Sequence, residues 1–217
     1  DNNVAIGYRA GYDLTSGSEN ILIGRGTGDA LTTGVNNVAI GHEALSTQIV
    51  HGQNVAIGYR ALKLQNVDGH GNNTAVGMQA GINVTTGVSN TLIGSIAGDA
   101  LTTGSSNVAV GVNALGAEDT LDGNTAIGFE ALKVQDGGTF NTTLGYQTGL
   151  AVSTGDQNTL LGTKAGDALT TGGNNIIIGY LAAAAGVGVD NTTVIGTTAT
   201  THALVHGLKQ PVIAASA

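Results

Sequence analysis

The hydrophobic positions of this chain recur in a seventeen-residue repeat, the spacing from Gly7 to Gly24. Each repeat contains three consecutive aliphatic or threonine residues followed by a glycine, as in Val55-Ala56-Ile57-Gly58. Only the step from Gly58 to Gly77 is longer. β-Branched residues favour strands, and glycine favours sharp corners. The pattern therefore predicts twelve coils with one short strand each. The glycines are Gly7, Gly24, Gly41, Gly58, Gly77, Gly94, Gly111, Gly128, Gly145, Gly162, Gly179 and Gly196.

We number the seventeen positions of each repeat from the residue that precedes the three aliphatic or threonine residues, so that Asn3 is position 1 of the first repeat. Position 1 is asparagine in every repeat except the last, where it is Thr192, and position 8 is always alanine or threonine. Identical asparagines stacked coil over coil predict an amide ladder. We expect an all-β fold, a parallel β-solenoid of twelve coils of about 17 residues over residues 1–208, with a C-terminal tail at 209–217. At ~4.8 Å per coil, such a solenoid would be on the order of 60 Å long.

Positions 9 and 12 exchange a large side chain. Where position 9 is glycine, as at Gly28, position 12 is aliphatic, as at Leu31. Where position 9 is leucine, as at Leu62, position 12 is polar, as at Gln65. This exchange indicates a core of fixed volume. The two kinds of coil come in consecutive pairs, so the repeat has a larger block of four coils.

Position 3 points to the opposite strand face from positions 2 and 4, and it is never charged. Both faces of the strand thus require cover. We expect position 3, as at Ala109, to be buried against another chain in a homotrimer, because threefold rotation closes a narrow fibre. The alternative is a monomeric solenoid with position 3 in water.

The one irregular step adds two residues within 66–72, which predicts a protruding turn.

The amino-acid composition argues against several classes of protein. The chain has 36 glycines, five tyrosines, two phenylalanines and 10% charged residues, unlike an ordinary globular core. A net charge of −8 disfavours nucleic acid and anionic membranes as partners. Residues 180–189, the longest apolar stretch, are too few for membrane insertion. Because the sequence opens at Asp1, we expect a mature product or a fragment.

The run Asn54-Val55-Ala56-Ile57-Gly58-Tyr59-Arg60-Ala61-Leu62 and its eleven relatives resemble the head repeat of YadA-like trimeric autotransporter adhesins, Asn-Ser-Val-Ala-Ile-Gly-x-x-Ser/Ala. The resemblance covers nearly the whole chain and implies a trimeric left-handed parallel β-roll. Adhesin heads typically use shorter coils than this chain. The longer coil looks more like the tail-fibre proteins of marine bacteriophages, cyanophages in particular.

These resemblances imply attachment without a reaction or a cofactor. The first expectation is a structural shaft of a phage tail fibre or spike, extracellular on the virion, that binds host receptors. Its expected partners are itself, other tail-fibre or baseplate proteins, and host cell-surface polysaccharide. The alternative is the head of a trimeric adhesin on a bacterial cell surface.

An enzyme is not expected, because the repeat spreads residues of one kind along columns. The nearest enzymatic alternative is a hexapeptide-repeat acyltransferase, but only one hexapeptide per coil fits, as the five residues 6–10 would within one such hexapeptide. Asp29, Asp99 and Asp167 recur every fourth coil and are better interpreted as turn carboxylates than as calcium ligands.

Two other features invite a ligand. His202 and His206 either fill the end of the roll or present rings to a threefold axis for a metal or an anion. Paired threonines such as Thr32-Thr33 suggest ice binding. In the intervening coils, however, Ile49-Val50 and other pairs take the same positions, so no continuous face of threonines runs along the solenoid.

A column of aromatics follows the corner glycines. Position 6 holds five of the seven aromatics, and position 7 beside it holds a charged or amide side chain in eight of the twelve repeats. Aromatic faces beside hydrogen-bonding groups suit sugar rings, so this ridge is a candidate receptor site; the alternative is packing between protomers. The ridge residues are Tyr8, Arg9, Tyr59, Arg60, Phe129, Glu130, Tyr146, Gln147 and Tyr180.

Overall fold

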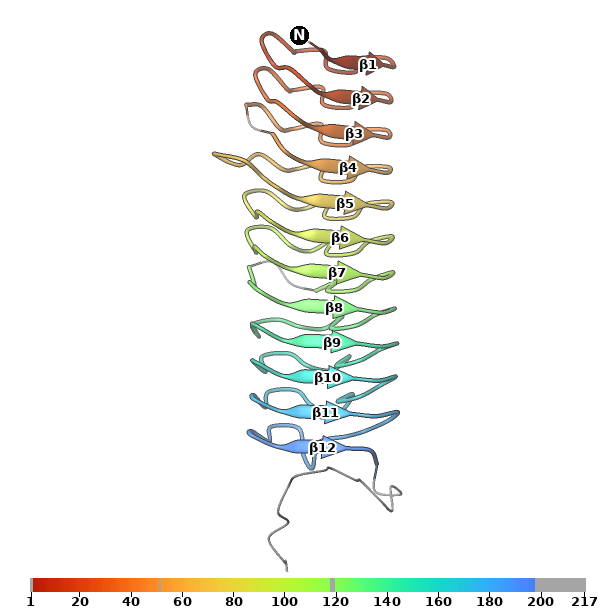
Figure 1. Cartoon of the computed structure of the whole chain (residues 1–217), viewed down its shortest axis with the longest axis vertical. Helices are drawn as coiled ribbons and strands as arrows, with labels where there is room; N and C mark the ends of the chain where they lie inside the picture. The colour runs from red at the N-terminus through yellow and green to blue at the C-terminus, as the bar shows by residue number, and fades with distance from the viewer. Residues whose placement is uncertain (1, 51, 118–119, 198–217) are drawn as a thin grey trace, which may run out of the picture.

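A computed structural model describes residues 2–50, 52–117 and 120–197 of the chain. This part is all β: twelve parallel strands form one sheet in chain order, and no helix occurs in these residues. Figure 1 shows the coils stacked in a single column with the strands aligned along one side. The strands are β1 (Val4–Ile6), β2 (Ile21–Ile23), β3 (Val38–Ile40), β4 (Val55–Ile57), β5 (Thr74–Val76), β6 (Thr91–Ile93), β7 (Val108–Val110), β8 (Thr125–Ile127), β9 (Thr142–Leu144), β10 (Thr159–Leu161), β11 (Ile176–Ile178) and β12 (Thr193–Ile195).

The predicted parallel β-solenoid is confirmed. Each strand pairs with the next in the register of the sequence repeat, as in Val38↔Val55 and, across the longer step, Val55↔Thr74. The chain makes about eleven turns between β1 and β12. The predicted solenoid end at residue 208, the tail at 209–217, and His202 and His206 all lie outside the described residues.

The asparagine ladder is also confirmed. The backbone N–H of Asn37 donates to Oδ1 of Asn20 one coil earlier, at 3.0 Å. Nδ2 of Asn20 donates to the carbonyl oxygen of Gly34 in its own coil, at 2.8 Å. Each buried amide therefore closes one coil and joins it to the next. At the end of the column, Thr192 donates its N–H to Asn175 Oδ1, at 2.9 Å, and its hydroxyl donates to the Asp190 carbonyl oxygen, at 3.3 Å.

The corner after each strand accepts only small residues. Gly24 has φ 136°, and a β-carbon there would lie 2.6 Å from the carbonyl oxygen of Gly41. Both the conformation and the close approach of the coils thus require glycine. At position 8, Thr27 is buried, and its hydroxyl donates to the same Gly41 carbonyl at 2.6 Å.

The prediction that position 3 faces a partner chain is wrong. Ala39 and Ala109 are fully buried inside their own coils, and positions 2 and 4 point outward. A strand of three residues turns only its middle side chain inward. The narrow interior is then completed by positions 8, 9 and 12 of the same coil.

The exchange between positions 9 and 12 is confirmed only for the aliphatic side chain: Leu31 and Leu62 are both fully buried, but Gln65 at position 12 of the Leu62 coil is fully buried as well. The structure adds a third participant at position 3. A β-carbon on Gly11 would lie 2.8 Å from Leu22 Cδ1, and one on Gly28 would lie 3.0 Å from Leu22 Cδ2. Leu22 thus fills the space beside two glycines in adjacent coils.

The protruding turn is confirmed as well. The turn that leads into β5 projects beyond its neighbours in Figure 1, and a β-carbon on Gly69 would meet nothing within 4 Å. The strand register before and after the turn is unchanged. The two added residues are absorbed outside the core.

Candidate functional site

The predicted ridge lies on the corner that follows each strand. Position 7 adopts a left-handed conformation, with φ 58° at Arg9, 54° at Glu43 and 57° at Arg60. Tyr8 and Tyr180 at position 6 are the most exposed members, at 70% and 68%. The ridge is therefore available to a ligand or to another chain.

The aromatic column is interrupted. Tyr59 stacks on His42 with ring centroids 5.4 Å apart, and Phe129 stacks on Tyr146 at 5.3 Å. Tyr8 is bridged to the first pair through Arg25, whose guanidinium lies 6.0 Å from the Tyr8 ring. Between the two groups, coils five to seven carry non-aromatic side chains at position 6. These are Met78, Ser95 and Val112.

Position 7 side chains contact one another between neighbouring coils. Arg60 Nε lies 2.9 Å from Glu43 Oε2, and Gln147 Nε2 donates to Glu130 Oε2 at 2.8 Å. Arg9 instead pairs with Asp29 at 3.0 Å. The structure thus brings the predicted polar residues together in two local groups.

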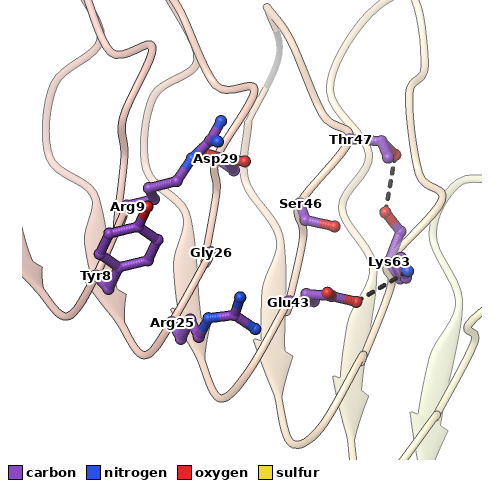
Figure 2. Close-up of a pocket in the computed structure, with 9 residues that line it drawn as sticks. All are labelled: Tyr8, Arg9, Arg25, Gly26, Asp29, Glu43, Ser46, Thr47 and Lys63. Atoms are coloured by element: carbon purple, nitrogen blue, oxygen red, sulfur yellow. Dashed lines mark hydrogen bonds and ion pairs between the residues drawn. The ribbon is translucent and has the colours of Figure 1, made fainter.

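A pocket of about 420 Å³ opens in the first group, where Gly26 occupies position 7. The missing side chain leaves a gap between the side chains above and below it. Figure 2 shows Arg9 and Arg25 on one side of this gap and Glu43 with Lys63 on the other. The lining residues are Tyr8, Arg9, Arg25, Gly26, Asp29, Glu43, Ser46, Thr47 and Lys63.

Most charges in the pocket are paired. Lys63 Nζ lies 2.9 Å from Glu43 Oε2. The hydrogen bond from Lys63, together with the one from Arg60, lowers the pKa of Glu43. The hydrogen bond to Asp29 raises the pKa of Arg9.

Arg25 is the exception. Its Nη1 lies 3.0 Å from His42 Nε2, so a neutral imidazole accepts this hydrogen bond. In the described part of the chain, no carboxylate lies within 4 Å of the Arg25 guanidinium. The pocket therefore holds one cation whose charge is not neutralised by an ion pair.

The sequence patterns did not identify the pocket residues at positions 10 and 11 or the gap at Gly26. Position 10 lies three residues after position 7, and the turn brings the two together. Lys133 Nζ, for example, lies 2.7 Å from Glu130 Oε1. Opposite charges at positions 7 and 10, either of one coil or of two adjacent coils, were the sequence pattern that could have predicted these ion pairs. The residues missed are Gly26, Asp29, Ser46, Thr47 and Lys63.

The pocket residues at positions 10 and 11 lie on the side of the coil opposite the strands. Position 9 faces position 3 across the interior, as the approach of Gly28 to Leu22 shows. The outward side chains of positions 10 and 11 therefore project from the opposite side of the coil. Leu64 at position 11 is 40% exposed there.

Other chemistry is sparse in the described residues. They include no group of three or more histidine or acidic side chains placed to hold a metal ion. No helix suited to crossing a membrane occurs among them. No family model, curated protein or solved structure matches the chain.

Proposed function

We propose that the chain is a non-enzymatic, homotrimeric shaft segment of a phage tail fibre or spike that also takes part in host attachment. The observation that carries this proposal is the outward face of the sheet. Positions 2 and 4 form two columns of aliphatic and threonine side chains along all twelve strands. Ile93, Leu144 and Ile176 are 39%, 47% and 43% exposed in the single chain.

A face of this size and composition is typical of an interface. Two columns of twelve side chains supply as many residues as the roughly 20–30 that each partner contributes to a standard protein–protein interface. None of these side chains is charged. Isolated apolar residues are normal on a surface, but a continuous strip marks association.

The strip also favours rotational symmetry along the fibre. Because all strands are parallel and in one register, the two columns run straight along the solenoid. A cyclic axis parallel to the strip allows each coil of one chain to pack against the same coil of the next. The resemblance to YadA-like heads and to phage fibres favours a threefold axis.

The remaining surface supports attachment better than catalysis. Polar groups lie in two local groups along the ridge, and Tyr8 and Tyr180 are 70% and 68% exposed and so available to sugar rings. We infer that host polysaccharide binds there and that other tail-fibre or baseplate proteins adjoin the shaft. The corresponding location is the exterior of the virion.

The second candidate is the head of a bacterial trimeric adhesin, which the Asn-Val-Ala-Ile-Gly runs at 54–58 favour. Sequencing the DNA around the gene separates the two. Adjacent tail and baseplate genes support the fibre. An outer-membrane barrel encoded downstream in the same reading frame would contradict it and support the adhesin.

A further inference from the structure

We propose that the pocket around Gly26 binds an acidic sugar unit, one that carries a carboxylate, within a host polysaccharide. This inference rests on the proposed attachment function and names the ligand class and the place. The blocks of four coils share one pattern of core residues but differ in their surface side chains.

The internal repeat shows that the pocket residues are not needed for the fold. Coils one, five and nine occupy equivalent places in their blocks, as do coils two, six and ten. The backbone is the same at these places: φ is 64° at Gly26 and 51° at Ile96. Yet three of the pocket residues are replaced, although Asp29 keeps aspartate equivalents at Asp99 and Asp167. Arg9 corresponds to Gln79 and Gln147, Arg25 to Ser95 and Thr163, and Gly26 to Ile96 and Lys164.

The first block is also where positive charge gathers. The chain has only seven lysines and arginines against fifteen acidic residues. Four of the seven, Arg9, Arg25, Arg60 and Lys63, belong to the pocket or to its Glu43 ion pair. With two carboxylates, Asp29 and Glu43, this cluster is cationic on an acidic protein. A cationic cluster of this kind attracts anions.

Arg25 is the anchor for the ligand. Its guanidinium is exposed and lacks a carboxylate partner in the described residues, so its planar donors are available for a bidentate contact with a carboxylate. The absent side chain of Gly26 provides the space beside it, since a β-carbon there would meet only Glu43 Cγ, at 3.7 Å.

The other walls suit a sugar ring. Tyr8 presents a ring that is 70% exposed, and Ser46 and Thr47 supply hydroxyl groups. Thr47 donates its proton to the Lys63 carbonyl at 2.8 Å, so its oxygen remains an acceptor for a sugar hydroxyl. A volume of about 420 Å³ is within the range of small-ligand pockets.

The pocket stays open in the proposed assembly. None of its lining residues belongs to a strand. Positions 10 and 11 project from the side opposite the strand face, and positions 6 and 7 lie on the corner beyond it, so none of them belongs to the strand columns through which the proposed trimer forms. One pocket per chain would face outward on the fibre.

The test is calorimetric titration of the full chain with trigalacturonate, a carboxylate sugar, and with the neutral galactotriose. We expect trigalacturonate to bind and galactotriose not to bind. Arg25→Ser and Gly26→Ile, which copy Ser95 and Ile96, should each weaken binding about tenfold or more while the melting temperature stays close to that of the wild type. Inorganic phosphate should bind more weakly than trigalacturonate.

The matched control is Lys164→Gln, which removes one positive charge at position 7 outside the pocket, where Gln79 and Gln147 already occur in left-handed conformation. It should leave binding unchanged. Equal weakening by this control would show unspecific charge attraction and would overturn the site. Phosphate binding as tight as that of trigalacturonate would overturn sugar recognition.

Sedimentation of the same samples separates this inference from the proposed function. A trimer that binds no trigalacturonate would overturn the pocket assignment alone. A monomer that binds it would overturn the trimeric shaft and retain the pocket.

Discussion

Leu22 and Gly28 face each other across the interior of the second coil, where a β-carbon on Gly28 would lie 3.0 Å from Leu22 Cδ2. The fourth coil shows the reverse arrangement, with Ala56 at position 3 and Leu62 at position 9, both fully buried. The same part of the interior is thus filled by the position 3 side chain in the second coil and by the position 9 side chain in the fourth. This relationship explains why the array keeps a constant cross-section through its blocks.

A double-mutant cycle tests this complementarity. Leu22→Ala should destabilise the chain by about 2–5 kcal/mol through a cavity, and Gly28→Leu by about 1–3 kcal/mol through overpacking. Together they should destabilise less than the sum, because the pair then copies Ala56 and Leu62. Urea unfolding gives the free energies. Strictly additive effects would show that the two positions do not share one volume.

A second prediction concerns Asp99. Burial raises the pKa of this carboxyl, although the N–H groups of Asp99 and Ala100 act in the opposite direction. A folded-state pKa above the unfolded value means that the ionised form is disfavoured in the fold. The contribution of Asp99 to stability is therefore highest below the unfolded pKa and falls as pH rises through the folded pKa.

Gln79→Arg should reverse this behaviour, because Gln79 and Asp99 occupy the positions of Arg9 and Asp29, which form an ion pair at 3.0 Å. We expect the pKa of Asp99 to fall in the variant and the melting temperature to rise more at pH 7 than at pH 3. Carbon-detected NMR titration of the carboxyl measures the first effect. An unchanged pKa would mean that the two coils do not align as those of the first block do.

Deleting Gly69 and His70 should leave the melting temperature nearly unchanged. A β-carbon on Gly69 would meet no atom within 4 Å, and the strands on either side keep their register. The deletion restores the regular step of the repeat. Thermal unfolding followed by circular dichroism is sufficient, and a fall of more than about 10 °C would show that this turn supports the core.

The double substitution Tyr59→Ala, Arg60→Ala distinguishes the two roles of the ridge. Tyr59 stacks on His42, and Arg60 pairs with Glu43, so both side chains lie on the surface of the coil. A host-contact ridge would lose binding to host cells while the trimer persists. Loss of the trimer would instead show that the ridge packs between protomers.

Much of the fold could be predicted because each coil meets only its neighbours, so one repeat specifies every contact. The asparagine ladder and the exchange between Gly28-type and Leu62-type coils follow directly from columns of identical residues. The inward face of the strand could not be assigned in this way. Val55, Ala56 and Ile57 are all apolar, and only the narrowness of the coil makes the alanine the inward residue.

The candidate site was only partly predictable. The ridge residues were visible as a column after the corner glycines. The pairing of Arg9 with Asp29 depends on the left-handed turn at position 7, which brings position 10 of the next coil within reach. A pocket formed by an absent side chain, as at Gly26, has no signal until neighbouring coils are placed in space.

The strand face can be tested by a matched pair of charges. Ile93 on the strand and Leu64 on the opposite side are 39% and 40% exposed. Ile93→Asp should break the proposed trimer, because it would bury an unpaired charge in the proposed interface, whereas Leu64→Asp should not. Size-exclusion chromatography with light scattering reports both masses. The interface would have to be placed elsewhere if the two variants behaved alike.

In the proposed trimer, the strand face joins three copies of the chain. Sedimentation velocity of the wild-type protein at micromolar concentration measures this assembly. We expect a single species with three times the 21.4 kDa mass of one chain. A stable, folded species at the mass of one chain, with its strand face in water, would contradict it.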